Sequence, residues 1–458
     1  MGKKILMLML LCQGVGLHPS IYANPVNLKD QSLAYASPCE GVKPESDLLR
    51  HFSQQLQTIP KIQRNQLIEH FWQSVEKSQT PIVEKINLDT SRIIYLWRGA
   101  QHNVRLVGGP SNDHEWLTKL PDTDIWFKEA IVKNDFIGSY NFAVDIKNVD
   151  GYLSNYCPHL NKELKESRGQ RMALRDAFQL DLYNSKRFLE QDIAGLRNEN
   201  LLMLDQAPAF VDPSQYVKRR LELKTLSLKS NILKNERKIT IYQSAKKNPQ
   251  QSYITAIFFD GNEYANLLNV PKALDILVEQ GKLPPIQAVF IDPINAQIRP
   301  KELTPNADFS QFFQKEVLPW LDQHIERDTQ KTVLLGSSLG GLSAAYIALE
   351  NPTQISHVVP LSGSFWWKKD KTDEPNGMSH IIRNSTLPTK QHWFISANSY
   401  ESSRVHNELS ILNTSPIVAN DLKEKGQYVV FKSYTGGHSY AVWQVIIQDA
   451  LQHFFVNK

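Results

Sequence analysis

The sequence predicts a chain with an α/β domain on a mostly parallel sheet, preceded by a smaller accessory domain folded as a β-sandwich. From about residue 216 onward, buried-strand patterns alternate with helical ones, as in a parallel sheet covered on both faces. Between about residues 81 and 149, short alternating apolar and polar runs are broken by glycines, as in a sandwich of antiparallel sheets. At 458 residues and 41% hydrophobic content, the chain is long enough for two or three folded domains.

The first 23 residues have the composition of a secretory signal peptide. Lys3 and Lys4 precede an apolar run from Ile5 to Leu17, which is too short to span a bilayer, and Ala23 offers a small residue at a cleavage site. We therefore expect the mature chain to begin at residue 24 and the protein to be exported.

The overall composition excludes some classes of function. The formal net charge is only +4, and removing residues 1–23 deletes two lysines and no acid. Nucleic acid is therefore not expected as the main partner, because phosphate binding needs a concentrated basic surface. No Cys and His residues have zinc-site spacing, so we expect neither a bound metal nor a cofactor. In an oxidising compartment Cys39 and Cys157 could form one disulfide, with two buried free thiols as the alternative.

The elements before residue 216 are expected to be helical at first and then mostly strands. Residues 24–67 form a partly helical leader, with helical spacing continuing to about residue 77. We assign residues 68–215 to the accessory domain, in which Ile93, Tyr95 and Trp97 alternate as in a strand. The charged stretch from about 160 to 200 is predicted to be a helical insertion. Residues 216–458 form the α/β domain.

Seven segments of the α/β domain have the composition of buried strands. They are Lys238–Tyr242, Tyr253–Phe259, Ala288–Ile291, Thr332–Leu335, Val358–Leu361, His392–Ser396 and Tyr428–Lys432.

The most informative motif follows the fourth of these strands. Gly336-Ser337-Ser338-Leu339-Gly340 lies between the apolar run 332–335 and a helical run that ends at residue 350. A strand, a sharp G-x-S-x-G turn and a helix are the parts of a nucleophile elbow, which exposes the hydroxyl of its central residue. The pentapeptide alone is a weak signal, but this setting makes Ser338 the expected nucleophile.

A serine nucleophile needs a base to take its proton and usually a carboxylate to steer that base. In α/β-hydrolases the chain order is nucleophile, acid, histidine. We expect His438 to be the base, because it lies in a glycine-rich loop directly after the last strand. Glu401 is the expected acid, because it follows the strand at 392–396; Asp421 and a dyad without an acid are the alternatives.

Acyl transfer also requires donors aimed at the developing oxyanion. The backbone N–H of Leu339, directly after the nucleophile, is one candidate. The second is the backbone N–H of Asn262, in the loop after the strand that ends at Phe259. Asp260 lies in the same loop but precedes the nucleophile, so we interpret it as a residue that orders the loop.

Many segments match a known family in order along the chain. In the first half they are Phe71-Trp72, Pro81-Ile82-Val83-Glu84, Tyr95-Leu96-Trp97-Arg98 and Gly138-Ser139-Tyr140. In the second half they are Phe259-Asp260-Gly261, Lys282-Leu283-Pro284-Pro285, Ile291-Asp292, Arg299, Glu302-Leu303, Asn306-Ala307-Asp308-Phe309, Glu316-Val317-Leu318-Pro319, residues 336–344, Ser362-Gly363-Ser364-Phe365-Trp366-Trp367 and Gly436-Gly437-His438. With these segments the chain resembles the enterochelin (enterobactin) esterases, in the esterase D-like branch of the α/β-hydrolases.

The resemblance implies hydrolysis of the ester bonds of a cyclic trilactone of dihydroxybenzoylserine, as the free siderophore or its iron complex. It places the family's nucleophile on Ser338, its histidine on His438 and its glutamate on Glu401, and it implies an immunoglobulin-like (E-set) sandwich as the accessory domain. Arg299 matches the family's arginine, and a guanidinium suits an anionic iron catecholate. Trp366 and Trp367 could stack on catechol rings, although neighbouring residues of an extended segment point opposite ways.

Two departures from the family pattern affect the interpretation. Residues 24–67 and the stretch near 160–200 have no counterpart, and the signal peptide implies a periplasmic enzyme where two-domain members are often cytoplasmic. One alternative function is a secreted carboxylesterase for another aromatic or sugar ester, such as a feruloyl ester. The other is a protein that binds a catecholate without turnover, which would have no need of a nucleophile elbow.

Overall fold

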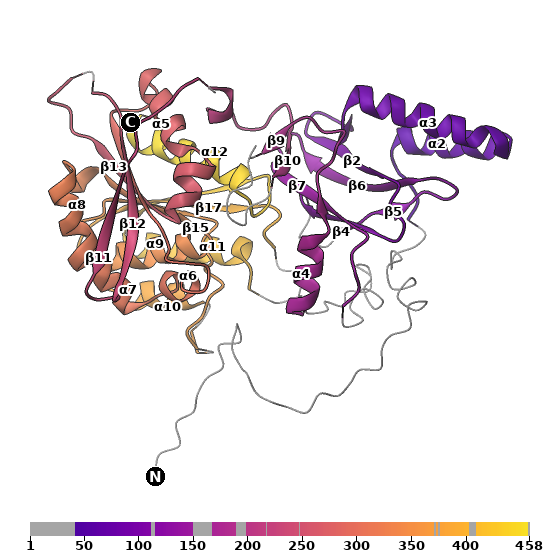
Figure 1. The fold of residues 1–458 in the computed structure, drawn as a ribbon. Coiled ribbons are helices and arrows are strands. Elements are labelled where there is room, and N and C mark those ends of the chain that lie inside the picture. Colours follow the sequence, from indigo (N-terminus) through magenta and orange to yellow (C-terminus); the bar gives the residue numbers. More distant parts are fainter. Residues whose placement is uncertain are drawn as a thin grey trace, which may run out of the picture.

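The computed structural model describes residues 42–110, 115–149, 167–188, 198–216, 218–246, 248–370, 372–373, 376–402 and 409–456. The expected signal peptide, Cys39 and Cys157 lie outside these residues. The described residues form two bodies side by side: an N-terminal part from α2 to β10, and an α/β part from β11 to α12 (Figure 1). Within the described ranges, no helix is long and apolar enough to cross a membrane.

The N-terminal part begins with two helices, α2 (Asp47–Thr58) and α3 (Lys61–Ser78). The hydroxyl of Ser46 accepts the backbone N–H of Leu49 and caps α2, and Pro60 separates the helices. Their apolar side chains, including those of Phe52 and Trp72, pack against one face of the sheet that follows. The helical spacing of this region is therefore confirmed.

Two antiparallel sheets make up the rest of the N-terminal part. The first has the order β1 (Ile82–Lys85), β2 (Thr90–Arg98), β6 (Ile125–Lys133) and β5 (Thr118–Lys119). The second has the order β4 (Glu115–Trp116), β3 (Val104–Gly108), β7 (Ile137–Val144), β10 (Glu199–Met203) and β9 (Arg187–Phe188), and β8 (Phe178–Gln179) also pairs with β7. One apolar cluster holds side chains of both sheets, such as Tyr95 of β2 and Phe142 of β7. The alternating patterns thus correctly predicted two packed layers of strands.

The predicted helical insertion at 160–200 is wrong over most of its described residues. Only α4 (Arg168–Asp176) is helical, and β8, β9 and β10 follow it. Leu182, which lies inside the predicted helical stretch, is 80% exposed in a turn. The backbone of β7 offers hydrogen bonds to β8 and β10, and such long-range pairing overrides local helical propensity.

The α/β part is built on eight strands in the order β11-β12-β14-β13-β15-β16-β17-β18. Their bounds are β11 (Lys224–Ser230), β12 (Asn235–Gln243), β13 (Ile254–Phe259), β14 (Ile286–Ile291), β15 (Thr332–Ser337), β16 (His357–Leu361), β17 (His392–Asn398) and β18 (Tyr428–Tyr434). The pairs β11–β12 and β12–β14 are antiparallel and all others are parallel. The seven predicted strands are confirmed, and β11 was missed.

Helices cover both faces of this sheet, as the alternating pattern predicted (Figure 1). α5 (Val270–Glu279) and α12 (Tyr440–Phe455) share an apolar cluster with one face. The other face packs against α6 (Arg299–Leu303), α7 (Ala307–Phe312), α8 (Leu318–His324), α9 (Leu339–Glu350), α10 (Gly377–Asn384) and α11 (Ile411–Glu424). Single π-helical turns, η4 (Glu263–Leu267) and η5 (Phe313–Val317), precede α5 and α8.

The two parts share buried contacts. Ile137 and Phe188 of the N-terminal part belong to the same apolar cluster as α12, and so does Val211 of the segment that connects the two parts. The amide of Gln448 on α12 accepts the backbone N–H of Val211 and donates to its carbonyl oxygen, both at 2.8 Å.

Candidate active site

The elbow between β15 and α9 has the backbone that a nucleophile elbow requires. Ser338 has φ 57° and ψ −120°, a conformation that residues with a Cβ seldom adopt. Its N–H donates to the carbonyl oxygen of Leu361 on the neighbouring strand, at 3.0 Å. A Cβ on Gly336 would collide with the backbone of Gly340, so the turn can close only with glycine there.

The hydroxyl of Ser338 lies beside a second hydroxyl. The Oγ atoms of Ser338 and Ser364 are 3.3 Å apart, and the backbone N–H of Ser364 donates to the carbonyl oxygen of Ser338 at 2.9 Å. Ser364 is 1% exposed, so its hydroxyl is a fixed neighbour of the expected nucleophile. Ser364 lies in one of the segments that match the family, but no role was predicted for it.

His438 and Glu401 form a close pair. His438 Nδ1 is 2.6 Å from Glu401 Oε1, and the backbone N–H of Asn398 donates to Oε2 at 2.7 Å. The Glu401 side chain is 1% exposed and that of His438 is 37% exposed. A carboxylate can only accept, so Nδ1 carries a proton, and Nε2 of the neutral ring is left to accept one.

Three residues for which no role was predicted connect the loop that carries Glu401 with the loop that carries His438. The Asn398 amide donates to the carbonyl oxygen of Gly437 at 2.9 Å and to Ser362 Oγ at 3.2 Å. Trp443 Nε1 donates to the same Oγ at 3.0 Å, and its ring lies edge-on to that of His438 at 4.8 Å. Asn398 and Ser362 are fully buried. Asn398 lies three residues before Glu401, and this proximity is the signal in the sequence that could have pointed to it.

The alternative acid, Asp421, lies elsewhere. It is buried on α11, where its carboxylate accepts hydrogen bonds from Arg383 Nε at 2.8 Å and from the Ser379 hydroxyl. These contacts connect α11 to α10 and give Asp421 a structural setting, whereas Glu401 is the carboxylate that contacts His438.

The loop after β13 is held by an ion pair. Arg299 Nε and Nη2 donate to the two carboxylate oxygens of Asp260, at 2.5 and 2.6 Å. Asp260 is 2% exposed and has φ 56°. The expectation that Asp260 orders this loop is confirmed, and the guanidinium expected to bind substrate is also a structural partner of that loop.

The two candidate oxyanion donors differ in their surroundings. Leu339 is the first residue of α9, where backbone N–H groups lack partners within the helix. The N–H of Asn262 instead has a carboxylate partner: burial raises the pKa of Asp292, and a hydrogen bond from this N–H opposes the rise. The Asn262 N–H therefore lies close to a carboxylate in this structure.

An acid with a shifted pKa lies next to this loop. Burial raises the pKa of Glu263 to about 7, and the neighbouring Asp260 carboxylate adds to the rise. Glu263 begins the π-helical turn η4, two residues beyond Gly261.

The two candidate tryptophans have different environments. Trp366 is 43% exposed, whereas Trp367 packs on the apolar cluster beneath α9 and against Gly377. The two rings therefore differ in burial, and the Trp366 ring is the more exposed of the two.

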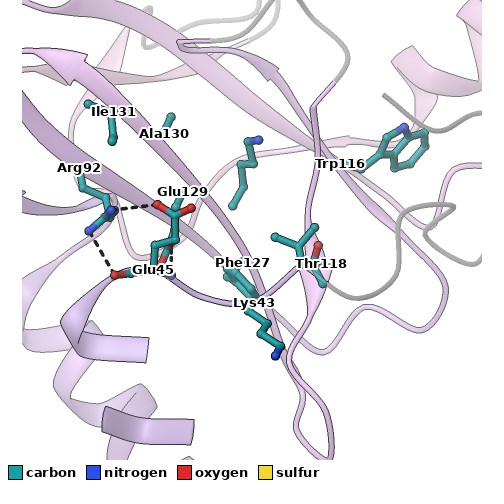
Figure 2. Close-up of a pocket in the computed structure, with 11 residues that line it drawn as sticks. Lys43, Glu45, Arg92, Trp116, Thr118, Phe127, Glu129, Ala130 and Ile131 are labelled. Atoms are coloured by element: carbon teal, nitrogen blue, oxygen red, sulfur yellow. Dashed lines mark hydrogen bonds and ion pairs between the residues drawn. The ribbon is translucent and has the colours of Figure 1, made fainter. Parts of the chain in front are cut away.

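A separate pocket of about 200 Å³ lies in the N-terminal part (Figure 2). It is lined by Lys43, Glu45, Arg92, Trp116, Phe127, Glu129 and neighbouring residues. Its charges are partly paired, because Arg92 binds the Glu45 carboxylate at 3.0 Å and Glu129 accepts the backbone N–H groups of Glu45 and Ser46. It shares no residue with the elbow or the His438–Glu401 pair.

The eight-stranded sheet, the elbow at Ser338 and the histidine–carboxylate pair at the same edge define an α/β-hydrolase. The family model described as "Putative esterase" matches residues 230–454, and the one described as "Enterochelin esterase, N-terminal" matches residues 92–212. The chain therefore belongs to the enterochelin esterase family and is a carboxylic ester hydrolase.

Known relatives agree with this membership. The iron(III) enterobactin esterase of Dickeya dadantii is 27% identical over 414 residues, which cover 82% of this chain and 90% of the relative. The iron(III) salmochelin esterase of Escherichia coli O6:H1 is 26% identical, with 85% and 95% covered. Among solved structures, the ferric enterobactin esterase of Salmonella typhimurium superposes with a TM-score of 0.67 at 23% identity, covering 84% of this chain and 98% of that one. The enterobactin esterase of Shigella flexneri, crystallised in the presence of enterobactin, has a TM-score of 0.65 at 23% identity, with 84% and 97% covered.

Proposed function

We propose that this protein hydrolyses the ester bonds of a trilactone catecholate siderophore, enterobactin or its ferric complex, to linear dihydroxybenzoylserine products, and so serves iron acquisition. The observation that carries the proposal is the 2.6 Å contact between His438 and Glu401 at the sheet edge that holds the Ser338 elbow, in a chain with both family domains in order. The relatives that match most of its length are enterobactin and salmochelin esterases.

The proposed mechanism assigns each reacting group to an atom of this site. Ser338 Oγ turns from Ser364 toward His438, whose Nε2 takes its proton as Oγ attacks the lactone carbonyl. Glu401 holds the ring by Nδ1 and stabilises the imidazolium that forms. The N–H of Leu339 donates to the oxyanion. His438 then protonates the leaving seryl oxygen, and the same groups activate water against the acyl-enzyme.

The residues proposed for substrate binding follow from exposure and charge. Trp366 presents an exposed ring that can stack on a catechol. Arg299 keeps Nη1 outside its two bonds to Asp260, and its side chain is 28% exposed. A partly available guanidinium suits the negative charge of a catecholate. Asn262 stays a candidate second oxyanion donor if substrate displaces its contact with Asp292.

The cellular setting and domain division are part of the proposal. The composition of residues 1–23 supports export to the periplasm, with residues 24–67 as a leader, 68–215 as an accessory domain and 216–458 as the catalytic domain. The two packed antiparallel sheets support an immunoglobulin-like (E-set) description of the accessory domain.

Product analysis tests the proposal. The mature protein and Ser338→Ala are incubated with enterobactin and with its ferric complex. The products are separated by chromatography and identified by mass spectrometry. We expect linear trimer, dimer or monomer of dihydroxybenzoylserine with the parent protein and an intact lactone with the variant. An intact trilactone with both proteins would reject this substrate and leave feruloyl or sugar esters as the next to test.

A further inference from the structure

The N-terminal part touches the α/β part at the two loops that carry the proposed base and acid. The backbone N–H of Ile137, the first residue of β7, donates to the carbonyl oxygen of Thr435 at 3.0 Å. The neighbouring ring of Phe136 lies edge-on to that of Tyr400, with centroids 5.9 Å apart. Thr435 lies three residues before His438, and Tyr400 directly precedes Glu401.

These contacts are buried and close. Phe136 and Ile137 are fully buried, and Tyr400 packs on the apolar cluster between the two antiparallel sheets. A Cβ on Gly436 would lie 2.6 Å from the carbonyl oxygen of Ile137, so the histidine loop rests directly on the backbone of β7.

The two loops are also bonded to each other. The N–H of Tyr400 donates to the carbonyl oxygen of Gly436 at 3.0 Å, and the Asn398 amide donates to that of Gly437 at 2.9 Å. Among the described residues, the hydrogen-bond partners of Ser338, Leu361 and Ser364, lie in contrast inside the α/β part, and so does the backbone of Gly363 beside the start of α9. A shift of the N-terminal part would therefore move His438 and Glu401 relative to Ser338.

From this arrangement we infer that the N-terminal part positions the His438–Glu401 pair, through the contacts of Phe136 and Ile137 with Tyr400 and the loop 435–437. The inference rests on the proposed function, because it assigns the base and acid to these loops. Phe136, Ile137 and Tyr400 are positioning residues, since they act on reacting groups only through the backbone of the two loops. A misplacement of about 1 Å can cost a reaction about 100-fold.

A double-mutant cycle on the ring pair tests this role. Phe136→Ala, Tyr400→Ala and the double variant are compared with the parent for kcat and KM on enterobactin. We expect each single change to lower kcat about tenfold with KM within twofold, and the double variant to be no worse than either single one. The matched control is Phe127→Ala, which empties an equally buried phenylalanine site on β6 against α2 and α3. It should leave kcat within twofold.

A third variant tests the backbone contact without emptying the core. Gly436→Ala places a methyl group against the Ile137 carbonyl, and we expect kcat to fall about 100-fold. The inference is overturned if kcat stays within twofold in all three single variants, or if Phe127→Ala lowers kcat as much as Phe136→Ala does.

A probe independent of the siderophore separates this inference from the substrate assignment. The rate at which a fluorophosphonate labels Ser338 reports activation of the nucleophile with no siderophore present. The parent protein could leave enterobactin intact and still be labelled. If labelling is then slower in Phe136→Ala, Tyr400→Ala and Gly436→Ala but not in Phe127→Ala, the positioning role is supported and only the substrate assignment is rejected. Equal labelling rates in all five proteins overturn the positioning role.

Discussion

Glu401→Gln would show whether the site works as a triad or as a dyad. Both carboxylate oxygens accept, one from His438 Nδ1 at 2.6 Å and one from the Asn398 N–H at 2.7 Å. A glutamine has one acceptor oxygen and one amide nitrogen, which can only donate. Its amide nitrogen must therefore face either the His438 ring or the Asn398 N–H, both of which donate to the carboxylate of Glu401. If the amide nitrogen faces His438, the ring is forced into the tautomer that cannot accept the serine proton.

The size of the effect follows from the lost charge. A carboxylate and an imidazolium about 4 Å apart attract by about 4 kcal/mol at an effective dielectric constant near 20. Because His438 is partly exposed, solvent and salt screen this attraction, and the Glu401 charge should stabilise the imidazolium by about 2–4 kcal/mol. That range corresponds to a loss of about 30- to 1,000-fold in kcat.

Steady-state hydrolysis of enterobactin, with thermal unfolding measured in parallel, is the assay. Glu424→Gln, at an exposed position in the last turn of α11, is the matched control and should leave kcat unchanged. A kcat for Glu401→Gln within twofold of the parent, in a folded protein, would contradict a role for the Glu401 charge and leave Ser338 and His438 as a dyad.

Three further changes test other parts of the structure. The pKa of Glu263 rises from 4.5 to about 7 in the folded protein, so its carboxyl group destabilises the fold increasingly as the pH rises through that window. Glu263→Gln should therefore be about 1–2 kcal/mol more stable than the parent at pH 8 and equally stable near pH 4, as measured by chemical denaturation. A difference in stability that does not change with pH would contradict this. Glu302→Ala should cost about 3–5 kcal/mol, because it leaves Arg237, 1% exposed at its side chain, without the carboxylate that binds it at 2.8 Å. Replacing that pair together, by Arg237→Met with Glu302→Leu, should cost far less, and equal losses would refute the ion-pair argument. Asn398→Ala should lower kcat about tenfold with KM little changed, since it removes the side-chain hydrogen bond to the histidine loop at Gly437 and the one to Ser362; a change in KM alone would argue against it.

The sequence was informative where structure is local. Buried parallel strands read as continuous apolar runs, so seven of the eight strands of the large sheet could be predicted. β11 was missed because its burial is partial and its pattern, Lys-Thr-Leu-Ser-Leu-Lys-Ser, is mostly polar. Ser338 could be found because the elbow needs a strand, two glycines and a helix in fixed order.

Contacts between distant segments could not be read from the sequence. The region from about 160 to 200 was predicted as helix because nothing in its composition reveals that β7 pairs with two of its segments. Trp443 and Ser362 are 81 positions apart, and the hydrogen bond between them exists only because strand order brings α12 beside the loop after β16. Asp260 and Arg299 are likewise a pair only in three dimensions.

The hydrogen-bonded environment of Ser338 lies within the α/β part, while the histidine loop has the N-terminal part directly behind it. Heat should therefore damage this enzyme in two stages. Loss of the contacts between the N-terminal part and the histidine loop would stop turnover while the eight-stranded sheet is still folded. Residual activity should therefore fall at a lower temperature than the far-ultraviolet circular dichroism signal. An inactivated sample cooled before the sheet melts should regain activity, because the turn that holds Ser338 would have kept its conformation throughout.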